Sequence, residues 1–173
     1  RFNVHNGGSL SRVGARYEDL PRRIALGPDL PAIDRTWFGS PVAEAAAGGL
    51  GSDRLFGLAG DDELSGGGGD DLLEGGAGND QLTGGGGDDL LVGGAGSDAY
   101  VIASRDGRDR IRDSDGRGVV LLQGRALLGG REVADGVDVD EHGTRYVLHE
   151  AEEDTWLLID GRLTIEDFRS GDL

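Results

Sequence analysis

Apolar residues recur at every ninth position between residues 48 and 101, and this is the strongest hydrophobic pattern in the chain. The segment divides into six successive nonapeptides, and the eighth position of each is apolar. These position-eight residues are Leu55, Leu64, Leu73, Leu82, Leu91 and Tyr100. The last three residues of each nonapeptide suit a very short strand whose eighth side chain points inward. The first six residues are rich in glycine and predict a turn.

A short repeating unit of loop and strand predicts a solenoid. Two units complete one turn of loop, strand, loop and strand, so units n and n+2 stack on the same side at about 4.8 Å, the usual spacing of paired strands. We therefore predict an all-β fold. It consists of a parallel β-roll over residues 48–112, an N-terminal flank over residues 1–47 and a C-terminal β-rich capping region over residues 113–173.

The two flanks carry weaker patterns. Strands are predicted at 119–122, 145–148, 156–159 and 163–165, with Asp160-Gly161 as the hairpin turn between the last two. Antiparallel strands there would cap the open end of the roll, because the end of a solenoid exposes both a strand edge and the core. Residues 1–47 contain all four prolines and one short helix candidate, Val42–Ala47. They fit either the tail of an upstream domain or a cap on the roll.

The polar positions of the nonapeptide are as regular as the apolar one. Positions one and four are glycine in all six copies, and position six is always aspartate: Asp53, Asp62, Asp71, Asp80, Asp89 and Asp98. In the roll, Asp53, Asp71 and Asp89 form a first column, and Asp62, Asp80 and Asp98 form a second column. Carboxylates stacked at the strand spacing repel each other strongly unless a cation lies between them. A repeating metal site is the prediction.

Composition alone would fit a disordered linker, since the segment is acidic, glycine-rich and poor in aromatic residues. The strict register of Asp and Leu argues against a linker. One inward apolar side chain per nonapeptide opposes the entropy cost of ordering the chain only weakly, so we expect folding to depend on the cation. An all-oxygen, flexible shell selects Ca²⁺ over Mg²⁺, and the repeats contain no His or Cys to bind Zn²⁺.

The charge excludes several partners. The net charge is −16, and residues 48–101 hold eleven acidic side chains against Arg54 alone, so we expect neither nucleic acid nor an anionic membrane as a partner. Cysteine is absent, which excludes disulfides and thiolate metal sites. No apolar run approaches the roughly 18 residues of a membrane span. Nothing in the sequence indicates the oligomeric state.

Residues 48–101 resemble the RTX (repeats-in-toxin, haemolysin-type) calcium-binding family, whose nonapeptide has the same glycines and aspartate. The resemblance implies a parallel β-roll with each ion between loops n and n+2. One loop supplies the carbonyls of positions two and four and its Asp, and the other supplies the carbonyls of positions one and three and its Asp. The four implied sites combine Gly49, Gly51 and Asp53 with Gly66, Gly68 and Asp71; Leu58, Gly60 and Asp62 with Gly75, Ala77 and Asp80; Gly67, Gly69 and Asp71 with Gly84, Gly86 and Asp89; and Gly76, Gly78 and Asp80 with Gly93, Ala95 and Asp98.

Three details depart from a uniform repeat. Leu58 replaces the family glycine at position two, but only its carbonyl would be needed. Position five varies and is interpreted as solvated turn support. After Val101 the pattern decays: Gly107 and Asp109-Arg110-Ile111 resemble a seventh copy displaced by two residues, in which Asp109 either pairs with Asp89 or lies outside the column. In the next window Gly118 takes the place of the aspartate, and Asp115 is interpreted as part of a surface turn.

The end of the chain, LLIDGRLTIEDFRSGDL, resembles the haemolysin-related segment that follows RTX repeats. Together the resemblances imply type I secretion: the chain stays unfolded in the calcium-poor cytosol and folds on Ca²⁺ outside the cell. The partners are then calcium ions and the type I secretion machinery, and the location is extracellular.

We find no catalytic constellation and predict no enzyme activity for this segment; the parent protein could be a secreted hydrolase or a toxin. Two alternatives stay open. The chain could be the C-terminal part of a secreted lipase or protease, with residues 1–47 in the catalytic domain, or the spacer of a surface adhesin.

Overall fold

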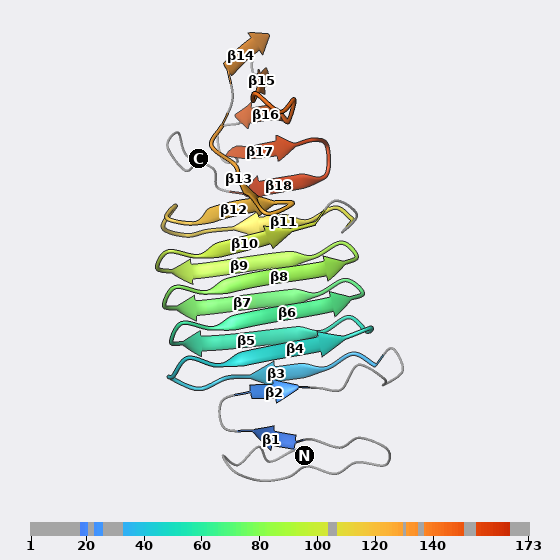
Figure 1. The fold of residues 1–173 in the computed structure, drawn as a ribbon, viewed down its shortest axis with the longest axis vertical. Coiled ribbons are helices and arrows are strands. Elements are labelled where there is room, and N and C mark those ends of the chain that lie inside the picture. Colours follow the sequence, from blue (N-terminus) through green and yellow to red (C-terminus); the bar gives the residue numbers. More distant parts are fainter. Residues whose placement is uncertain are drawn as a thin grey trace.

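All regular structure in the described part of this protein is β-strand. The computed structural model describes residues 18–20, 23–25, 33–103, 107–129, 131–134, 137–150 and 155–166, and no helix occurs within these ranges. The strands form an eight-stranded and a ten-stranded sheet. The strands of successive turns stack along the long axis of the molecule (Figure 1). The prediction of an all-β parallel roll with antiparallel C-terminal strands is confirmed. Within the same ranges, no helix has the length and apolar character needed to cross a bilayer.

The roll alternates between the two sheets at every nonapeptide. One sheet contains β4 (Ala45–Gly49), β6 (Glu63–Gly68), β8 (Gln81–Gly86), β10 (Ala99–Ile102) and β12 (Val119–Leu122). The other contains β3 (Thr36–Phe38), β5 (Arg54–Ala59), β7 (Leu72–Ala77), β9 (Leu90–Ala95) and β11 (Arg110–Arg112). Neighbours are parallel, and Leu55 pairs with Leu73, which pairs with Leu91. Two nonapeptides therefore make one turn, as predicted.

The strands are longer than the sequence pattern indicated. Each full strand begins at position seven and continues through positions one to three of the next nonapeptide, so only positions four to six form the turn. The prediction of a six-residue turn and a three-residue strand is wrong in this respect. The physical reason is that backbone groups at positions one to three also pair with the turn above, as Gly67 does with Gly85, so their hydrogen bonds are satisfied within the ladder.

The core of the roll is a column of position-eight side chains that come alternately from the two sheets. The five leucines of this column are fully buried, and Tyr100 is 1% exposed. Ile111 and Ile165 extend the column at the C-terminal end, and Trp37 and Ala46 extend it at the N-terminal end. Although the segment has few large apolar side chains, the position-eight leucines among them are fully buried.

The roll begins before the first recognisable nonapeptide. Strands β3 and β4 pair in parallel with β5 and β6, and Trp37 and Ala46 stand opposite Leu55 and Leu64. The helix candidate Val42–Ala47 is wrong, because the alanines form part of β4. The intrinsic helix preference of alanine is weak compared with a complete set of ladder hydrogen bonds. Further out, β2 (Arg23–Ala25) pairs with β4 and with β1 (Glu18–Leu20).

The C-terminal strands continue the roll instead of forming a separate sheet. They are β13 (Arg125–Ala126), β14 (Arg131–Ala134), β15 (Val137–Val139), β16 (Arg145–Glu150), β17 (Thr155–Ile159) and β18 (Leu163–Glu166). Strand β18 pairs in parallel with β11, and β14 to β18 are joined to each other by antiparallel pairing. The four strands predicted here are confirmed, as is the turn at Asp160-Gly161, where both residues have positive φ.

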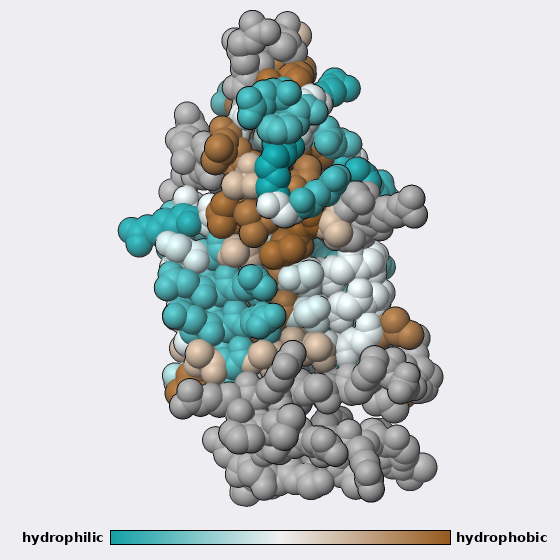
Figure 2. Space-filling view, in the orientation of Figure 1, coloured by the Kyte–Doolittle hydropathy of each residue, from teal (hydrophilic) through white to brown (hydrophobic). Residues whose placement is uncertain are grey.

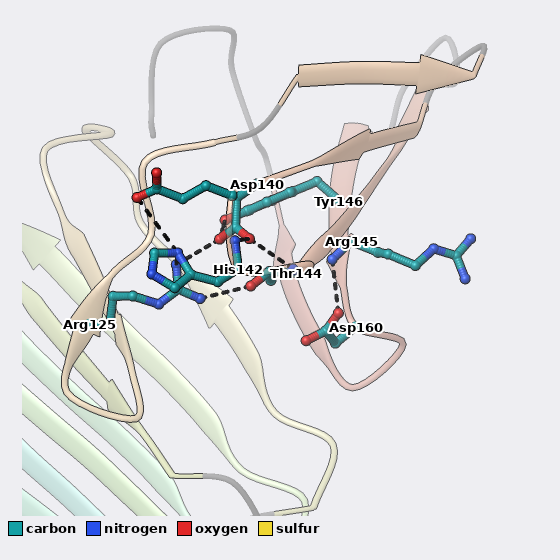
Figure 3. Close-up of polar contacts among 8 residues, drawn as sticks. Arg125, Asp140, His142, Thr144, Arg145, Tyr146 and Asp160 are labelled. Atoms are coloured by element: carbon teal, nitrogen blue, oxygen red, sulfur yellow. Dashed lines mark hydrogen bonds and ion pairs between the residues drawn. The ribbon is translucent and has the colours of Figure 1, made fainter.

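A partly buried ion pair links β13 to the loop between β15 and β16. Arg125 contacts Asp140 at 2.7 Å and donates a second hydrogen bond to the Thr144 hydroxyl, while the amides of His142 and Thr144 donate to Asp140 (Figure 3). Burial would raise the pKa of Asp140, but the hydrogen bonds from Arg125 and Thr144 outweigh it and hold the pKa well below its usual range. On the face in Figure 2, apolar residues gather mainly over these C-terminal strands, and the roll is hydrophilic or near-neutral.

Candidate metal centre

The position-six aspartates are buried at the ends of the turns, although they are charged residues. All six are between 1% and 3% exposed, and Asp109 is 3% exposed. In each column the backbone N–H of one aspartate donates to Oδ1 of the aspartate one turn later. Asp53 donates to Asp71 at 2.7 Å, and Asp62 donates to Asp80 at 2.8 Å. The two predicted columns therefore exist, and one oxygen of each carboxylate is fixed by the backbone.

The second carboxylate oxygen has no such donor. The Oδ2 atoms of Asp53, Asp62, Asp71, Asp80 and Asp98 are buried and have no hydrogen-bond partner. A buried carboxylate oxygen without a donor is costly, because it has lost water and gained nothing in exchange. A cation that binds this oxygen would remove the cost, and a carboxylate is the type of ligand that Ca²⁺ prefers.

The glycine at position one makes room for this oxygen. A Cβ atom on Gly66 would overlap Oδ2 of Asp71 and would lie 2.7 Å from the carbonyl oxygen of Gly84. A Cβ atom on Gly75 would likewise overlap Oδ2 of Asp80. The invariant glycine is thus explained by space: a carboxylate oxygen and, at Gly66, the position-one carbonyl of the next turn meet beside its Cα.

Burial raises the pKa of aspartates in both columns. Burial, with a smaller contribution from the neighbouring carboxylate of Asp53, raises the pKa of Asp71 to about 7 against an opposing backbone hydrogen bond. Burial also raises the pKa of Asp98 to about 6, and the pKa values of Asp53, Asp62 and Asp80 are raised for the same main reason. The metal-free site therefore resists full ionisation, and a bound cation would favour the charged form.

The backbone carbonyls expected as ligands lie between successive loops. The carbonyl oxygens of positions two and four lie against the Cα of the same position one turn later; these oxygens belong to Gly49, Gly51, Leu58, Gly60, Gly67, Gly69, Gly76 and Gly78. The carbonyl of position three accepts the position-four N–H of the loop below, as Ala77 does from Gly60 at 2.8 Å. Within the described ranges no three Asp, Glu, His or Cys side chains converge, so a metal there needs backbone carbonyls to complete its shell.

Backbone conformation explains the glycines at positions two and four. Both positions have positive φ through most of the roll, with 111° at Gly67 and 101° at Gly69 as examples. Leu58 has the same conformation, with φ of 77°, although it carries a side chain. The sequence interpretation that only its carbonyl matters is therefore incomplete, because the left-handed conformation is strained for leucine.

The seventh copy continues the first column. Oδ1 of Asp109 accepts the N–H of Asp89 at 3.1 Å, Gly107 has φ of 104°, and Ile111 is buried beside Leu91. The two inserted residues lie before Gly107 and do not change the register of β11 with β9. Of the two alternatives for Asp109, the one that places it beside Asp89 matches the structure.

The eighth window exchanges the aspartate and the glycine. Gly118 follows Asp98 in the second column, and a Cβ atom there would overlap Oδ2 of Asp113, which stands at position one. The Tyr100 hydroxyl donates to the same oxygen at 3.0 Å. A carboxylate is therefore still present at this end of the column, but it is supplied by the opposite end of the nonapeptide. Asp115 is exposed and accepts the N–H of Gly96 at 3.0 Å.

Position-five side chains link the turns on the outside. Asp61 accepts the N–H of Asn79 at 2.7 Å, and Asp70 accepts the N–H of Asp88 at 2.9 Å. These side chains are exposed, whereas the Oδ2 atoms of position six are buried, and this agrees with turn support. Positions five and six thus bond in opposite directions along the roll, since position five accepts from the later turn and position six from the earlier one.

Sequence reasoning missed two residues at position six. Arg35 and Glu44 stand one turn before Asp53 and Asp62, and their N–H groups donate to the Oδ1 atoms of these aspartates at 2.7 and 2.8 Å. The signal was an offset of 18 residues from each aspartate. It was hidden because residues 30–47 keep only one of the glycines that mark the later copies, Gly39 at position one.

Of the comparisons with known proteins, the match to a family model agrees with this geometry. The family model described as the RTX calcium-binding nonapeptide repeat (4 copies) matches residues 47–82 and 65–100. Among solved structures, the chain is similar to a subunit of the mannuronan C5-epimerase from Azotobacter vinelandii, with 25% identity, coverage of 80% of this chain and 74% of that chain, and a TM-score of 0.26. That TM-score is too low to support an inference. No curated protein matches the chain. Residues 47–100, which combine this match with a regular glycine register and two columns of buried aspartates, therefore contain RTX calcium-binding nonapeptide repeats.

Proposed function

We propose that this chain is a calcium-binding module that folds on Ca²⁺ binding after type I secretion and acts as the folding, secretion and stability module of a larger extracellular protein. The observation that carries the proposal is the set of buried Oδ2 atoms without hydrogen-bond partners in both columns. Each turn adds another carboxylate to a stack that already carries negative charge. The metal-free roll is therefore under electrostatic stress that a hard cation relieves.

Four ions are proposed between the six position-six aspartates, and Asp109 extends the first column beyond Asp89. Asp71 and Asp80 each belong to two of the four proposed sites, whereas Asp53, Asp62 and Asp98 belong to one. When bound, Ca²⁺ neutralises the paired carboxylates and draws the carbonyls of neighbouring loops together. The chain itself supplies the rest: glycines that leave space, an Oδ1 that is fixed by a backbone N–H, and a leucine column that holds the two sheets in register.

The proposed role in secretion depends on the difference in Ca²⁺ concentration between the cytosol and the outside of the cell. A cytosol poor in Ca²⁺ would leave the columns unscreened, and the glycine-rich chain would stay unfolded for export. Outside, Ca²⁺ at the roughly 10⁻⁴–10⁻³ M affinity of extracellular modules would fold it. Parallel pairing of β18 with β11 supports a C-terminal end that folds first, since it gives the last turn of the roll an edge on which to pair. We assign no catalytic role to the module.

Calcium titration followed by circular dichroism tests the proposal. The chelated chain should show a coil-like spectrum that converts cooperatively to β-structure with CaCl₂ and much less with MgCl₂. Asp71→Asn should raise the calcium midpoint, because two proposed ions share this carboxylate. Asp70→Asn is the matched control, since Asp70 is exposed, next in sequence and able to accept the same hydrogen bond as an amide. A chelated protein that is already fully folded would contradict calcium-dependent folding.

Secretion needs a separate measurement. A reporter fused upstream of the chain should appear in the medium of cells that carry a type I secretion system, and should stay inside cells that lack it. Retention of the reporter in both strains would reject the secretion role and would leave calcium binding unaffected.

A further inference from the structure

Arg35 stands where every later turn of the first column has an aspartate. Its N–H donates to Oδ1 of Asp53, just as the N–H of Asp53 donates to Asp71. Its carbonyl accepts the N–H of Arg54 at 2.8 Å, and the carbonyl of Asp53 accepts that of Leu72 at 2.9 Å. Arg35 therefore makes the backbone hydrogen bonds of a position-six residue, but its side chain carries a positive instead of a negative charge.

The guanidinium of Arg35 lies between the first two loops of this column. Its Nη1 donates to the carbonyl oxygen of Gly48, and the group covers Gly49, whose Cβ would lie 3.2 Å from Cζ and 3.4 Å from Nη2. Gly48 is at position one of its nonapeptide. One turn later the equivalent carbonyl belongs to Gly66, which is among the proposed calcium ligands. The guanidinium thus already binds a carbonyl oxygen of the kind that a metal would use.

The electrostatics of this end agree with the contacts. Burial raises the pKa of Asp53, while the backbone N–H and the positive charge of Arg35 lower it; no cationic side chain lowers the pKa of Asp62, Asp71, Asp80 or Asp98 in this way. An arginine keeps its charge at every physiological pH, so this cation is permanent. In the second column the same place is taken by Glu44. Its carboxylate accepts a hydrogen bond from the N–H of Ser40 at 2.6 Å.

We propose that Arg35 is a built-in cation that takes the place of Ca²⁺ between the first two loops of the first column. The inference rests on the proposed calcium-binding function and adds a limit to it. The first column then begins with a loop pair that needs no metal, whereas the second column begins with a glutamate. Calcium binding in the first column starts only at the pair of Asp53 and Asp71, and the number of bound ions is limited by a protein side chain.

Counting bound ions tests the assignment. Full-length wild-type chain, Arg35→Asp and Arg54→Asp are saturated with CaCl₂ and analysed by native mass spectrometry and isothermal titration calorimetry. Arg54→Asp is the matched control, because it makes the same charge change in the adjacent turn at an exposed side chain. Arg35→Asp should bind one more ion than wild type, and Arg54→Asp should bind the same number. An unchanged number of ions in folded Arg35→Asp would overturn the proposal.

Three further variants test the proposal if Arg35→Asp does not fold. Arg35→Gln removes the positive charge without supplying a carboxylate, and should raise the calcium midpoint of folding by about twofold or more, because a charged hydrogen-bond donor between the loops is lost. Arg35→Lys should restore part of the shift, and Arg54→Gln should leave the midpoint unchanged. Equal midpoints for Arg35→Gln and Arg54→Gln would overturn the proposal. A wild-type chain that binds no calcium would instead reject the proposed function.

Discussion

The position-one glycine gives the sharpest test of the site, because a single methyl group is enough to obstruct it. In Gly66→Ala the new Cβ would overlap Oδ2 of Asp71 and lie 2.7 Å from the carbonyl oxygen of Gly84. The carbonyl belongs to β8, which is paired with β6 and β10, so we expect the carboxylate to be displaced. Gly86 offers a matched control in the same roll, because its only proposed contribution to a site is its backbone carbonyl, which alanine keeps. A Cβ on Gly86 meets nothing within 4 Å, and neither glycine has a positive φ.

The magnitude follows from these contacts. Overpacking a well-packed interior costs about 1–3 kcal/mol, and both atoms that the methyl group meets are constrained. Gly86→Ala should change the free energy of unfolding by about 0.5 kcal/mol or less, or should stabilise slightly by reducing the freedom of the unfolded chain. The difference between the two variants should therefore be about 2 kcal/mol. If two to four ions bind as the chain folds, this difference raises the calcium midpoint of Gly66→Ala by about twofold to fivefold.

Urea denaturation at saturating CaCl₂ and calcium titration in buffer, both followed by circular dichroism, measure the two quantities. Gly66→Ala should lower the urea midpoint and raise the calcium midpoint, and Gly86→Ala should do neither. Equal midpoints for the two variants would refute the argument that position one is glycine because the aspartate oxygen needs its space. A Gly66→Ala variant with a lower urea midpoint but an unchanged calcium midpoint would show a packing effect without a role in ion binding.

Three further predictions follow from single positions. Leu58→Gly should raise the free energy of unfolding by about 0.5–1 kcal/mol in urea, because φ of 77° is strained for leucine and its side chain is half exposed; a loss of stability would contradict the strain argument. Leu73→Ala should cost about 2–5 kcal/mol because the side chain is fully buried, whereas Leu128→Ala, 80% exposed, should cost little, and similar urea midpoints would argue against the leucine column as the core. Because burial raises the pKa of Asp71 to about 7 and that of Asp98 to about 6, the metal-free fold binds more protons than the unfolded chain between about pH 4 and 7, so its stability falls as pH rises through this window. Acidifying the chelated chain from pH 7.5 to 5 should therefore increase the β signal in circular dichroism, and no increase would contradict the burial of these carboxylates.

Sequence alone determined the parts of this protein that repeat within nine residues. The recurring leucine predicted the inward side chain of each strand, and the constant spacing predicted the stacking of every second nonapeptide. The carboxylates followed from the same register, because residues that recur with the period of the solenoid fall into columns. The C-terminal strands were also predictable, since 156–159 and 163–165 are apolar runs joined by Asp160-Gly161, a strong hairpin signal.

Tertiary structure decided what depends on the partner one turn away. The extension of each strand into positions one to three could not be read from glycine-rich residues, because their pairing comes from the neighbouring turn and not from local preference. Arg35, Glu44 and Asp113 became part of the columns only when the ladder placed them beside Asp53, Asp62 and Tyr100. The physical reason is the same in each case. Strand pairing places each residue beside the residue of the neighbouring turn that has the same register, whatever its type. The chemistry of its side chain then decides whether that position suits a metal ion.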